Sequence, residues 1–240
     1  MQWLARKLVP REGVIQCGLG KGLRFDATGG YPGYLLGTSE PEEQALLGRL
    51  LKPGMVFYDI GANIGFYSTL AAGLVTATGR VCAFEPFPES ARLCRKNALS
   101  NGFAQVTVVE AAVGAENARV TLSLGEGSAM HKVAKGGPGI EVPVVAIDSW
   151  RRETGAPAPQ VVMIDVEGAE IEVMRGMLTT IKDSLPVLLV EVHWLGESFV
   201  DFVRLQLEPL GYRLTTYAGG AVPPGYTRYH ALLAPSGSNS

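Results

Sequence analysis

Acidic side chains recur where short apolar segments of this 240-residue sequence end. The residues concerned are Asp59, Glu85, Asp165 with Glu167, and Glu191 with His193. The carboxyl ends of parallel strands meet at one edge of a sheet, and ligands bind there. Any one of these acids could simply cap the helix that follows it. The whole set predicts a binding edge that carries carboxylates and an imidazole.

The turn after residue 58 carries the most specific pattern. It reads Asp59-Ile60-Gly61-Ala62-Asn63-Ile64-Gly65, which predicts a strand, a tight turn and the start of a helix. Gly61 and Gly65 allow the backbone to approach a ligand closely. Asp59 would repel a pyrophosphate, and the spacing differs from the GxGxxG of dinucleotide sites. It would suit a methionyl ammonium, and Glu85 could accept hydrogen bonds from ribose hydroxyls. This chemistry favours S-adenosyl-L-methionine over NAD.

Strand-like and helix-like segments alternate along most of the chain. Strands are expected at residues 56–60, 81–84, 106–109, 161–164, 186–193, 212–216 and 229–233, and helices near 64–76, 88–100, 170–182 and 197–210. Strands of such continuous apolar character are buried on both faces of a parallel sheet. The pattern predicts one α/β domain with a Rossmann-like, doubly wound, mostly parallel sheet.

The chain is expected to divide into three parts. They are an N-terminal extension that forms a lid over the cofactor (residues 1–38), the main domain (39–234) and a disordered tail (235–240). Ser39 is expected to cap a helix that begins the main domain. Two short strands should flank a glycine-rich loop within residues 118–145.

Composition limits the possible partners and compartments. Hydrophobic residues make up 47% of the chain, charged residues 18%, and the net charge is −2. No basic stripe is present to bind a nucleic-acid backbone. Glycines interrupt the one long apolar stretch, so no membrane span is predicted. Three cysteines without CxxC spacing favour a reducing, cytoplasmic location.

Several motifs together resemble the FkbM-type S-adenosylmethionine-dependent methyltransferases. They are Asp59-Ile60-Gly61-Ala62-Asn63-Ile64-Gly65, Phe84-Glu85-Pro86, the Asn97 to Gly102 helix end, Ala112-Val113-Gly114 and Ile164-Asp165-Val166-Glu167-Gly168-Ala169-Glu170. The resemblance covers about residues 40–195. It implies a class I methyltransferase fold with a seven-stranded sheet, helices on both faces and an antiparallel last strand. It also implies methylation of a hydroxyl on a sugar, polyketide or other secondary-metabolite scaffold.

The resemblance also implies roles for individual residues. The methionyl part would be contacted by Asp59, Gly61, Ala62, Asn63 and Gly65. The ribose and adenine would be contacted by Glu85, Pro86, Phe87, Ala111 and Ala112. The transferring methyl would face Asp165, Glu167 and Glu170. The segments 1–38 and 115–145 match the family weakly. The identity of the acceptor therefore cannot be carried over.

Transfer of a methyl group to a hydroxyl needs a base. His193 is the first candidate because imidazole titrates near neutral pH, and Asp165 is the second. Glu167 and Glu170 would orient these groups or act as acids at the helix N-terminus. Glu191, two residues before His193, completes the catalytic set. Asp165, Glu167, Glu191 and His193 could instead bind Mg²⁺ or another divalent ion, but no spacing demands a metal, and none is predicted. His131, in the glycine-rich loop, is either a contact of the acceptor or a solvated side chain.

Other functions stay open at this point. The protein could be an N-methyltransferase, a catalytically silent S-adenosylmethionine-binding module or an NAD-dependent oxidoreductase. The expected partner is a small hydroxyl-bearing molecule, with no nucleic acid and no membrane. The apolar sheet edges could support a homodimer.

Overall fold

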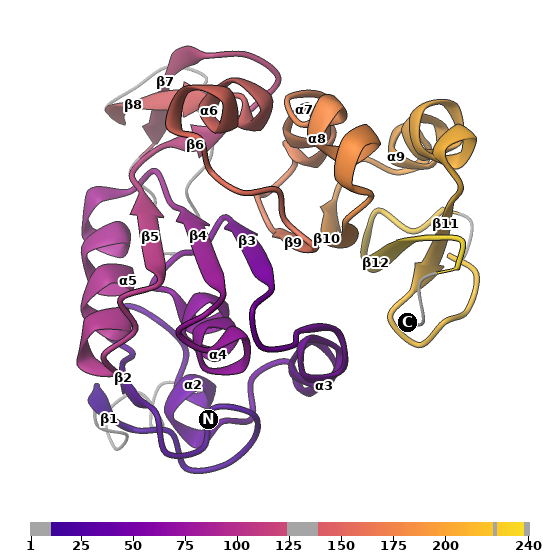
Figure 1. Ribbon diagram of the computed structural model, residues 1–240. Coiled ribbons are helices and arrows are strands. Elements are labelled where there is room, and N and C mark those ends of the chain that lie inside the picture. Colours follow the sequence, from indigo (N-terminus) through magenta and orange to yellow (C-terminus); the bar gives the residue numbers. More distant parts are fainter. Residues whose placement is uncertain (1–10, 124–138, 223–224, 238–240) are drawn as a thin grey trace.

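The computed structural model describes residues 11–123, 139–222 and 225–237. A seven-stranded sheet with the order β11-β12-β10-β9-β3-β4-β5 forms its centre (Figure 1). The strands are β3 (Val56–Ile60), β4 (Arg80–Phe84), β5 (Val106–Val109), β9 (Val161–Ile164), β10 (Val187–His193), β11 (Tyr212–Thr216) and β12 (Arg228–Pro235). The strands from β10 to β5 are parallel, and β12 runs antiparallel to both of its neighbours. This confirms the predicted sheet and its antiparallel last strand.

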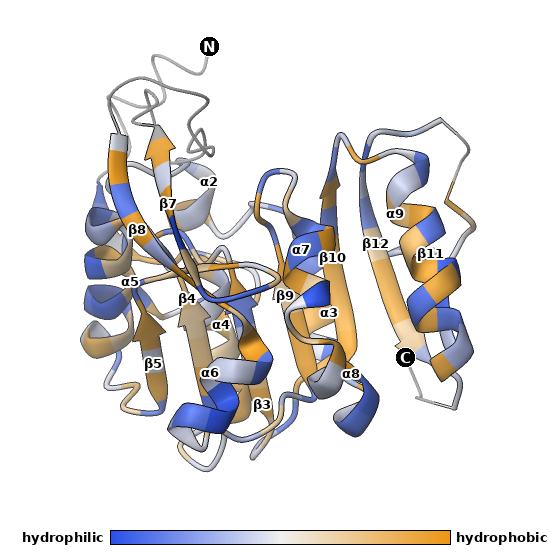
Figure 2. Ribbon diagram, turned by 90° about the horizontal axis from the view of Figure 1, so that it is seen from above, coloured by the Kyte–Doolittle hydropathy of each residue, from blue (hydrophilic) through white to orange (hydrophobic). Residues whose placement is uncertain are grey.

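Helices cover both faces of the sheet. One layer holds α3 (Pro41–Leu50), α4 (Phe66–Val75) and α5 (Pro88–Ser100), and the other holds α6 (Ile147–Thr154), α7 (Glu170–Arg175), α8 (Leu178–Ser184) and α9 (Glu197–Phe202). Side chains of β3 alternate between the layers: Phe57 belongs to the core cluster that includes α3 and α4, while Tyr58 faces the other layer, where its ring meets Trp150 of α6. Figure 2 shows the apolar strands between helices with polar outer sides. Among the described residues, no helix has the length and apolar character needed to cross a bilayer.

The order of the strands reverses at β3. The chain runs from β3 outward through β4 to β5, then returns to the other side of β3 with β9. At this point the turn after β3 touches the end of β9, since a Cβ on Gly61 would lie 1.8 Å from the carbonyl oxygen of Asp165. Gly61 has φ +90°, which favours glycine. Ligands of doubly wound sheets bind at such a reversal.

Two smaller sheets flank the main one. An antiparallel pair, β1 (Glu12–Val14) and β2 (Arg24–Asp26), precedes the short helix α2 (Gly33–Leu36). A three-stranded sheet consists of β6 (Ala112–Val113), β7 (Ala118–Ser123) and β8 (Gly139–Val145). The sequence predicted β7 and β8, but the two residues of β6 are too few to show a periodicity. The loop that carries His131 lies outside the described residues.

The predicted helix start and one predicted helix differ in the structure. Ser39 is not the cap of α3, because Glu40 takes that position with a left-handed backbone and Pro41 begins the helix. The single helix expected near 170–182 is two helices, α7 and α8. The break falls at Gly176, where a Cβ would lie 2.0 Å from the carbonyl oxygen of Gly114. Tertiary packing therefore overrides local helix propensity here.

The C-terminal elements also correct the prediction. The helix expected over 197–210 is α-helical only to Phe202, and then continues as a π turn over Val203–Leu207 and a 3₁₀ turn over Glu208–Leu210. Pro209 lies in the 3₁₀ turn, where its missing N–H prevents an α-helix from continuing. The tail does not begin at Pro235, since β12 includes this residue and pairs it with Tyr212. Residues 238–240 lie outside the described part.

Asn97 of α5 and Asn101, directly after this helix, bind the N-terminal extension to the domain. Asn97 is fully buried; its Oδ1 accepts the Asp26 N–H at 2.7 Å, and its Nδ2 donates to the carbonyl oxygens of Asp26 and Ile64. One turn later, Asn101 makes a similar pair of bonds with the backbone of Arg24. Residues 11–38 are therefore packed onto α4 and α5. Their action as a lid stays a prediction.

Replacing Asn97 should destabilise the protein more than replacing a surface neighbour. In Asn97→Ala, one N–H and two carbonyl groups lose a buried partner, so we expect the free energy of unfolding to fall by about 2–4 kcal/mol. Urea denaturation measures this change. Ser100→Ala, at an exposed position of the same helix, should change it by less than about 0.5 kcal/mol. Equal effects of the two substitutions would contradict the role of Asn97.

Candidate active site

Asp59 lies beneath α4. It is the fourth residue of β3, is 3% exposed, and accepts a hydrogen bond from Ser68 Oγ at 2.5 Å. Burial raises its pKa to about 6. The carboxylate that we expected to meet a methionyl ammonium therefore has a hydroxyl partner inside the protein.

Glu85 and Asn63 form a polar corner beside the turn that follows β3. Glu85 is 6% exposed, and its two oxygens accept the N–H groups of Asn63 and Phe87, each at 2.8 Å. Burial raises its pKa to about 7. Asn63 has a left-handed backbone, φ 51°, and its buried Oδ1 has no hydrogen-bond partner. Each oxygen of Glu85 keeps a lone pair that can accept a further bond.

The residues expected around adenine lie near the ends of β4 and β5. Ala111 is buried, and Pro86 and Ala112 are partly buried. Phe87 is 6% exposed and packs in a small apolar cluster with Leu122 of β7. Its ring therefore supports the three-stranded sheet, whereas Pro86 remains accessible.

Asp165 and Glu167 follow β9. The Asp165 side chain is 43% exposed, and its backbone N–H donates to the carbonyl oxygen of Ile60 at 2.9 Å. Burial by the surrounding protein, together with the charge of Glu191, raises its pKa to about 8. Glu167 has φ 54°, an uncommon angle for a residue with a side chain.

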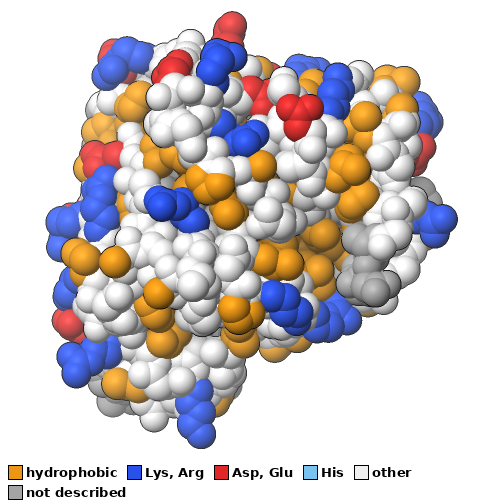
Figure 3. All heavy atoms as spheres, viewed as in Figure 1, with side chains coloured by type: hydrophobic (Ala, Val, Ile, Leu, Met, Phe, Trp, Pro, Cys, Tyr) orange, Lys and Arg blue, Asp and Glu red, His pale blue; other side chains and the backbone are white. Residues whose placement is uncertain are grey.

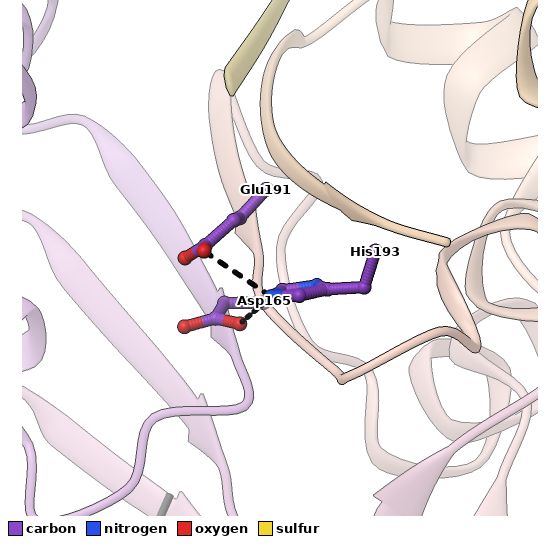
Figure 4. Close-up of side chains that lie close together, drawn as sticks. All are labelled: Asp165, Glu191 and His193. Carbon is purple, nitrogen blue, oxygen red and sulfur yellow. Dashed lines mark ion pairs between the residues drawn. The ribbon is translucent and has the colours of Figure 1, made fainter. Parts of the chain in front are cut away.

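His193 lies at the centre of a ring of carboxylates. Its side chain is fully buried, and Nδ1 is 2.8 Å from Oε1 of Glu170, which is also fully buried. Nε2 lies 3.1 Å from Glu191 Oε1, 3.9 Å from Asp165 Oδ1 and 4.0 Å from Glu167 Oε2. Figure 4 shows the Asp165 and Glu191 side chains converging on the ring. The structure thus brings all four predicted catalytic side chains together.

The ring of carboxylates changes the protonation of His193. Burial alone would lower the pKa of the imidazole, but contacts with Glu170 and Glu191 raise it to about 10. Burial would likewise raise the pKa of Glu191, but contacts with His193, His230 and Arg228 hold it well below its usual range. Glu191 is therefore ionised at neutral pH.

The sequence did not predict the partners of Glu191. Arg228 Nη2 lies 2.7 Å from its Oε1, and His230 Nε2 lies 3.7 Å from its Oε2. The other ring nitrogen of His230 is 2.8 Å from Glu43 of α3, and contacts with Glu191 and Glu43 raise the pKa of His230 to about 10. No sequence signal links Glu43 to His230, because they come from opposite ends of the chain.

Replacing the buried Asp59 should stabilise the protein above pH 6. The pKa of Asp59 is raised in the folded state, so folding becomes less favourable as pH rises from about 4 to 6 and the carboxyl ionises. Asp59→Asn removes this charge and can still accept the Ser68 hydroxyl. We expect its free energy of unfolding to exceed that of the parent by about 1–3 kcal/mol at pH 8. Urea denaturation at several pH values measures the difference.

The advantage of Asp59→Asn should shrink as pH falls toward 4, where the parent carboxyl is also neutral. Asp201→Asn, at an exposed ion pair with Arg204, is the matched control and should show no such trend. A difference that stays constant between pH 4 and pH 8 would contradict the assignment.

Sequence comparison finds curated methyltransferases as relatives. Hexuronic acid methyltransferase AglP of Haloferax volcanii is 28% identical over 142 residues, which cover 58% of this chain and 56% of that protein. The 2-O-methyltransferase NoeI of Sinorhizobium fredii is 28% identical over 151 residues, which cover 55% and 60%. The chain thus spans less than two thirds of the length of each.

Solved structures share the fold. The methyltransferase FkbM from Methylobacillus flagellatus matches with a TM-score of 0.51 at 17% identity, covering 85% of this chain and 53% of that one. An rRNA methylase from Streptococcus thermophilus matches with a TM-score of 0.51 at 10% identity, covering 81% and 95%. Family comparison adds a match between residues 59–214, more than half of the chain, and the methyltransferase FkbM domain. The motifs, the sheet order and this match agree that the chain belongs to the FkbM methyltransferase domain family.

Proposed function

We propose that this protein transfers a methyl group from S-adenosyl-L-methionine to a hydroxyl of a small-molecule acceptor. The observation that carries the proposal is the polar corner made by Glu85 and Asn63 at the reversal of strand order. The corner combines a carboxylate at the end of β4 with the turn that follows β3. This arrangement suits a ribose-bearing ligand.

The residues of this corner fit the cofactor. Asn63 Oδ1 is buried without a partner, and buried polar atoms rarely lack one. Glu85 is held in place by two N–H bonds and keeps lone pairs for ribose hydroxyls. Pro86 would border the adenine. Asp59, which lies under α4, would act on the methionyl ammonium through its charge.

A sugar hydroxyl is the acceptor class that we propose. The names of two relatives specify a hexuronic acid and a 2-O position. A nucleic-acid acceptor is less compatible with the charge distribution. The net charge is −2, and on the face shown in Figure 3 the Lys and Arg side chains are scattered.

The residues at the ends of β9 and β10 would prepare the acceptor. When bound, S-adenosyl-L-methionine supplies an electrophilic methyl group on a sulfonium. The acceptor oxygen forms the new bond to the methyl carbon as the carbon–sulfur bond breaks, and its proton must leave. Asp165 is the more accessible proton acceptor because its side chain is 43% exposed, whereas His193 is fully buried. Alignment of the acceptor with the methyl carbon would supply several kcal/mol in addition.

Cofactor binding should depend on the polar corner. We expect Glu85→Gln and Asn63→Ala to weaken the binding of S-adenosyl-L-homocysteine about 10- to 100-fold, since each substitution removes a hydrogen bond that involves a buried group. Isothermal titration calorimetry measures the dissociation constants. Glu89→Gln, at an exposed position of α5, should bind like the parent.

The same titration tests the alternative cofactor. Binding of NAD without binding of S-adenosyl-L-homocysteine would refute the proposed function. If S-adenosyl-L-homocysteine binds the Glu85 and Asn63 variants as tightly as the parent, the proposed site is refuted.

Methyl transfer should depend on Asp165. With hexuronic acids and neutral sugars as acceptors, we expect an O-methyl ether as the product, identified by mass spectrometry and by its resistance to mild base. Asp165→Asn should lower kcat by about 10²–10⁴-fold and leave cofactor affinity within about threefold, because the residue lies outside the polar corner. Glu172→Gln, which is exposed on α7, is the control.

The products separate this proposal from its rivals. A base-labile methyl ester or an N-methyl product would refute O-methylation of a hydroxyl. Cofactor binding without turnover on any sugar acceptor would favour a silent binding module.

A further inference from the structure

His193 is buried without a partner for one of its ring nitrogens. Its side chain has no exposed surface, and Nε2 makes no hydrogen bond. The nitrogen nevertheless lies 3.1 to 4.0 Å from carboxylate oxygens of Asp165, Glu167 and Glu191, and Figure 4 shows Asp165 and Glu191 beside the ring. Buried ring nitrogens are almost always satisfied by a hydrogen bond or a ligand. In the neutral imidazole the Nε2 lone pair would face carboxylate oxygens, and a bound cation between them would remove this repulsion.

Glu170 prepares the ring for such a cation. Its Oε1 lies 2.8 Å from Nδ1, and both side chains are fully buried. This carboxylate also accepts the N–H of Gly168 at 3.0 Å, which holds it in place. An Nδ1–H that donates to Glu170 leaves the lone pair on Nε2. A histidine that binds a metal almost always donates its other ring N–H to a carboxylate, a carbonyl or a water.

The distance from Nε2 to Glu191 is that of neighbouring ligands on one ion, and Asp165 Oδ1 lies farther away, at 3.9 Å. The ligand atoms offered by Asp165, Glu191 and His193 lie within 4.8 Å of one another. With metal–ligand bonds of about 2.2 Å, adjacent ligands at right angles are about 3.1 Å apart. Glu191 Oε1 lies 3.1 Å from Nε2, yet too far off the ring axis for a good hydrogen bond. An off-axis position is where a ligand adjacent to Nε2 belongs.

The charges of the site also favour a bound cation. Within the described ranges, Arg228 is paired with Glu191, but no lysine or arginine is paired with Asp165 or Glu167. These two carboxylates remain partly accessible, with side-chain exposures of 43% and 25%. An ion could therefore enter this site from solvent. It could keep coordination positions open for an oxygen of the acceptor.

We propose that Asp165, Glu191 and His193 bind a divalent transition-metal ion at the ends of β9 and β10. One imidazole with two carboxylates suits Mn²⁺, Fe²⁺ or Zn²⁺, whereas Mg²⁺ and Ca²⁺ prefer oxygen ligands alone. A proton and the metal ion compete for Nε2, and either one would face the same carboxylates, as at other metal sites. If the proposed function holds, on which this role depends, the ion binds the acceptor hydroxyl and makes its proton easier to remove.

Mn²⁺ is the probe that tests the site. Titration of the metal-free full-length protein, followed by electron paramagnetic resonance, should show one bound Mn²⁺ per chain with a dissociation constant of about 10–100 µM. Asp165→Asn and His193→Gln should each weaken binding about tenfold or more, and Glu170→Gln should weaken it about 10- to 100-fold. Glu172→Gln, outside the site, should bind like the parent. Asp165 is partly exposed, so its variant is expected to fold even if the His193 variant does not.

The outcomes separate the metal site from the proposed function. Absence of a stoichiometric Mn²⁺ signal below about 1 mM, or binding unchanged in Asp165→Asn, would overturn the metal site and indicate an imidazolium paired with carboxylates. S-adenosyl-L-homocysteine binding is measured separately on metal-free protein. Its failure, with Mn²⁺ binding intact, would overturn the methyltransferase proposal and leave the metal site standing. Loss of methyl transfer after chelation, restored by Mn²⁺, would support both.

Discussion

The close approach of Gly61 to Asp165 determines how the two halves of the site meet. A Cβ at position 61 would lie 1.8 Å from the carbonyl oxygen of Asp165, so no other residue fits without moving one of the strand ends. The contact joins the turn of β3, beside the polar corner, to the end of β9, where the carboxylates begin. Glycine at position 61 thus serves the protein's own backbone, and not only a ligand.

Local pattern predicted the elements and placed the site residues at one edge. Continuous apolar runs identified β3, β4, β9 and β10. The acidic residues near the ends of these runs lie at the expected edge because parallel strands end together. The helix break at Gly176 could not be predicted in this way. It depends on the carbonyl oxygen of Gly114, which is remote in sequence and is brought close only by the fold.

The partners that surround the site residues were less predictable than which residues form the site. Asp59 and Glu85 carry the same charge at equivalent strand ends, yet one has a serine hydroxyl as its partner and the other has two backbone N–H groups. Alternation along β3 explains the difference, since it turns Asp59 toward α4. The partners of Glu191 likewise come from β12 and α3, and neither element carries a motif that points to this role.

Burial of carboxylates at the sheet edge has a cost that a soluble domain normally avoids. Asp59, Glu85 and Glu170 are each at least nine-tenths buried, and an ionised carboxyl is disfavoured there unless it is hydrogen-bonded or paired. The domain offsets this cost with the large apolar layers on both faces of the sheet. Uncompensated polar atoms persist at Asn63 Oδ1 and His193 Nε2. One lies at the end of β3 and the other at the end of β10, on either side of β9. Two of the six buried side-chain atoms that lack a hydrogen-bond partner in the described part of the chain therefore lie where a cofactor and an activated acceptor would be needed.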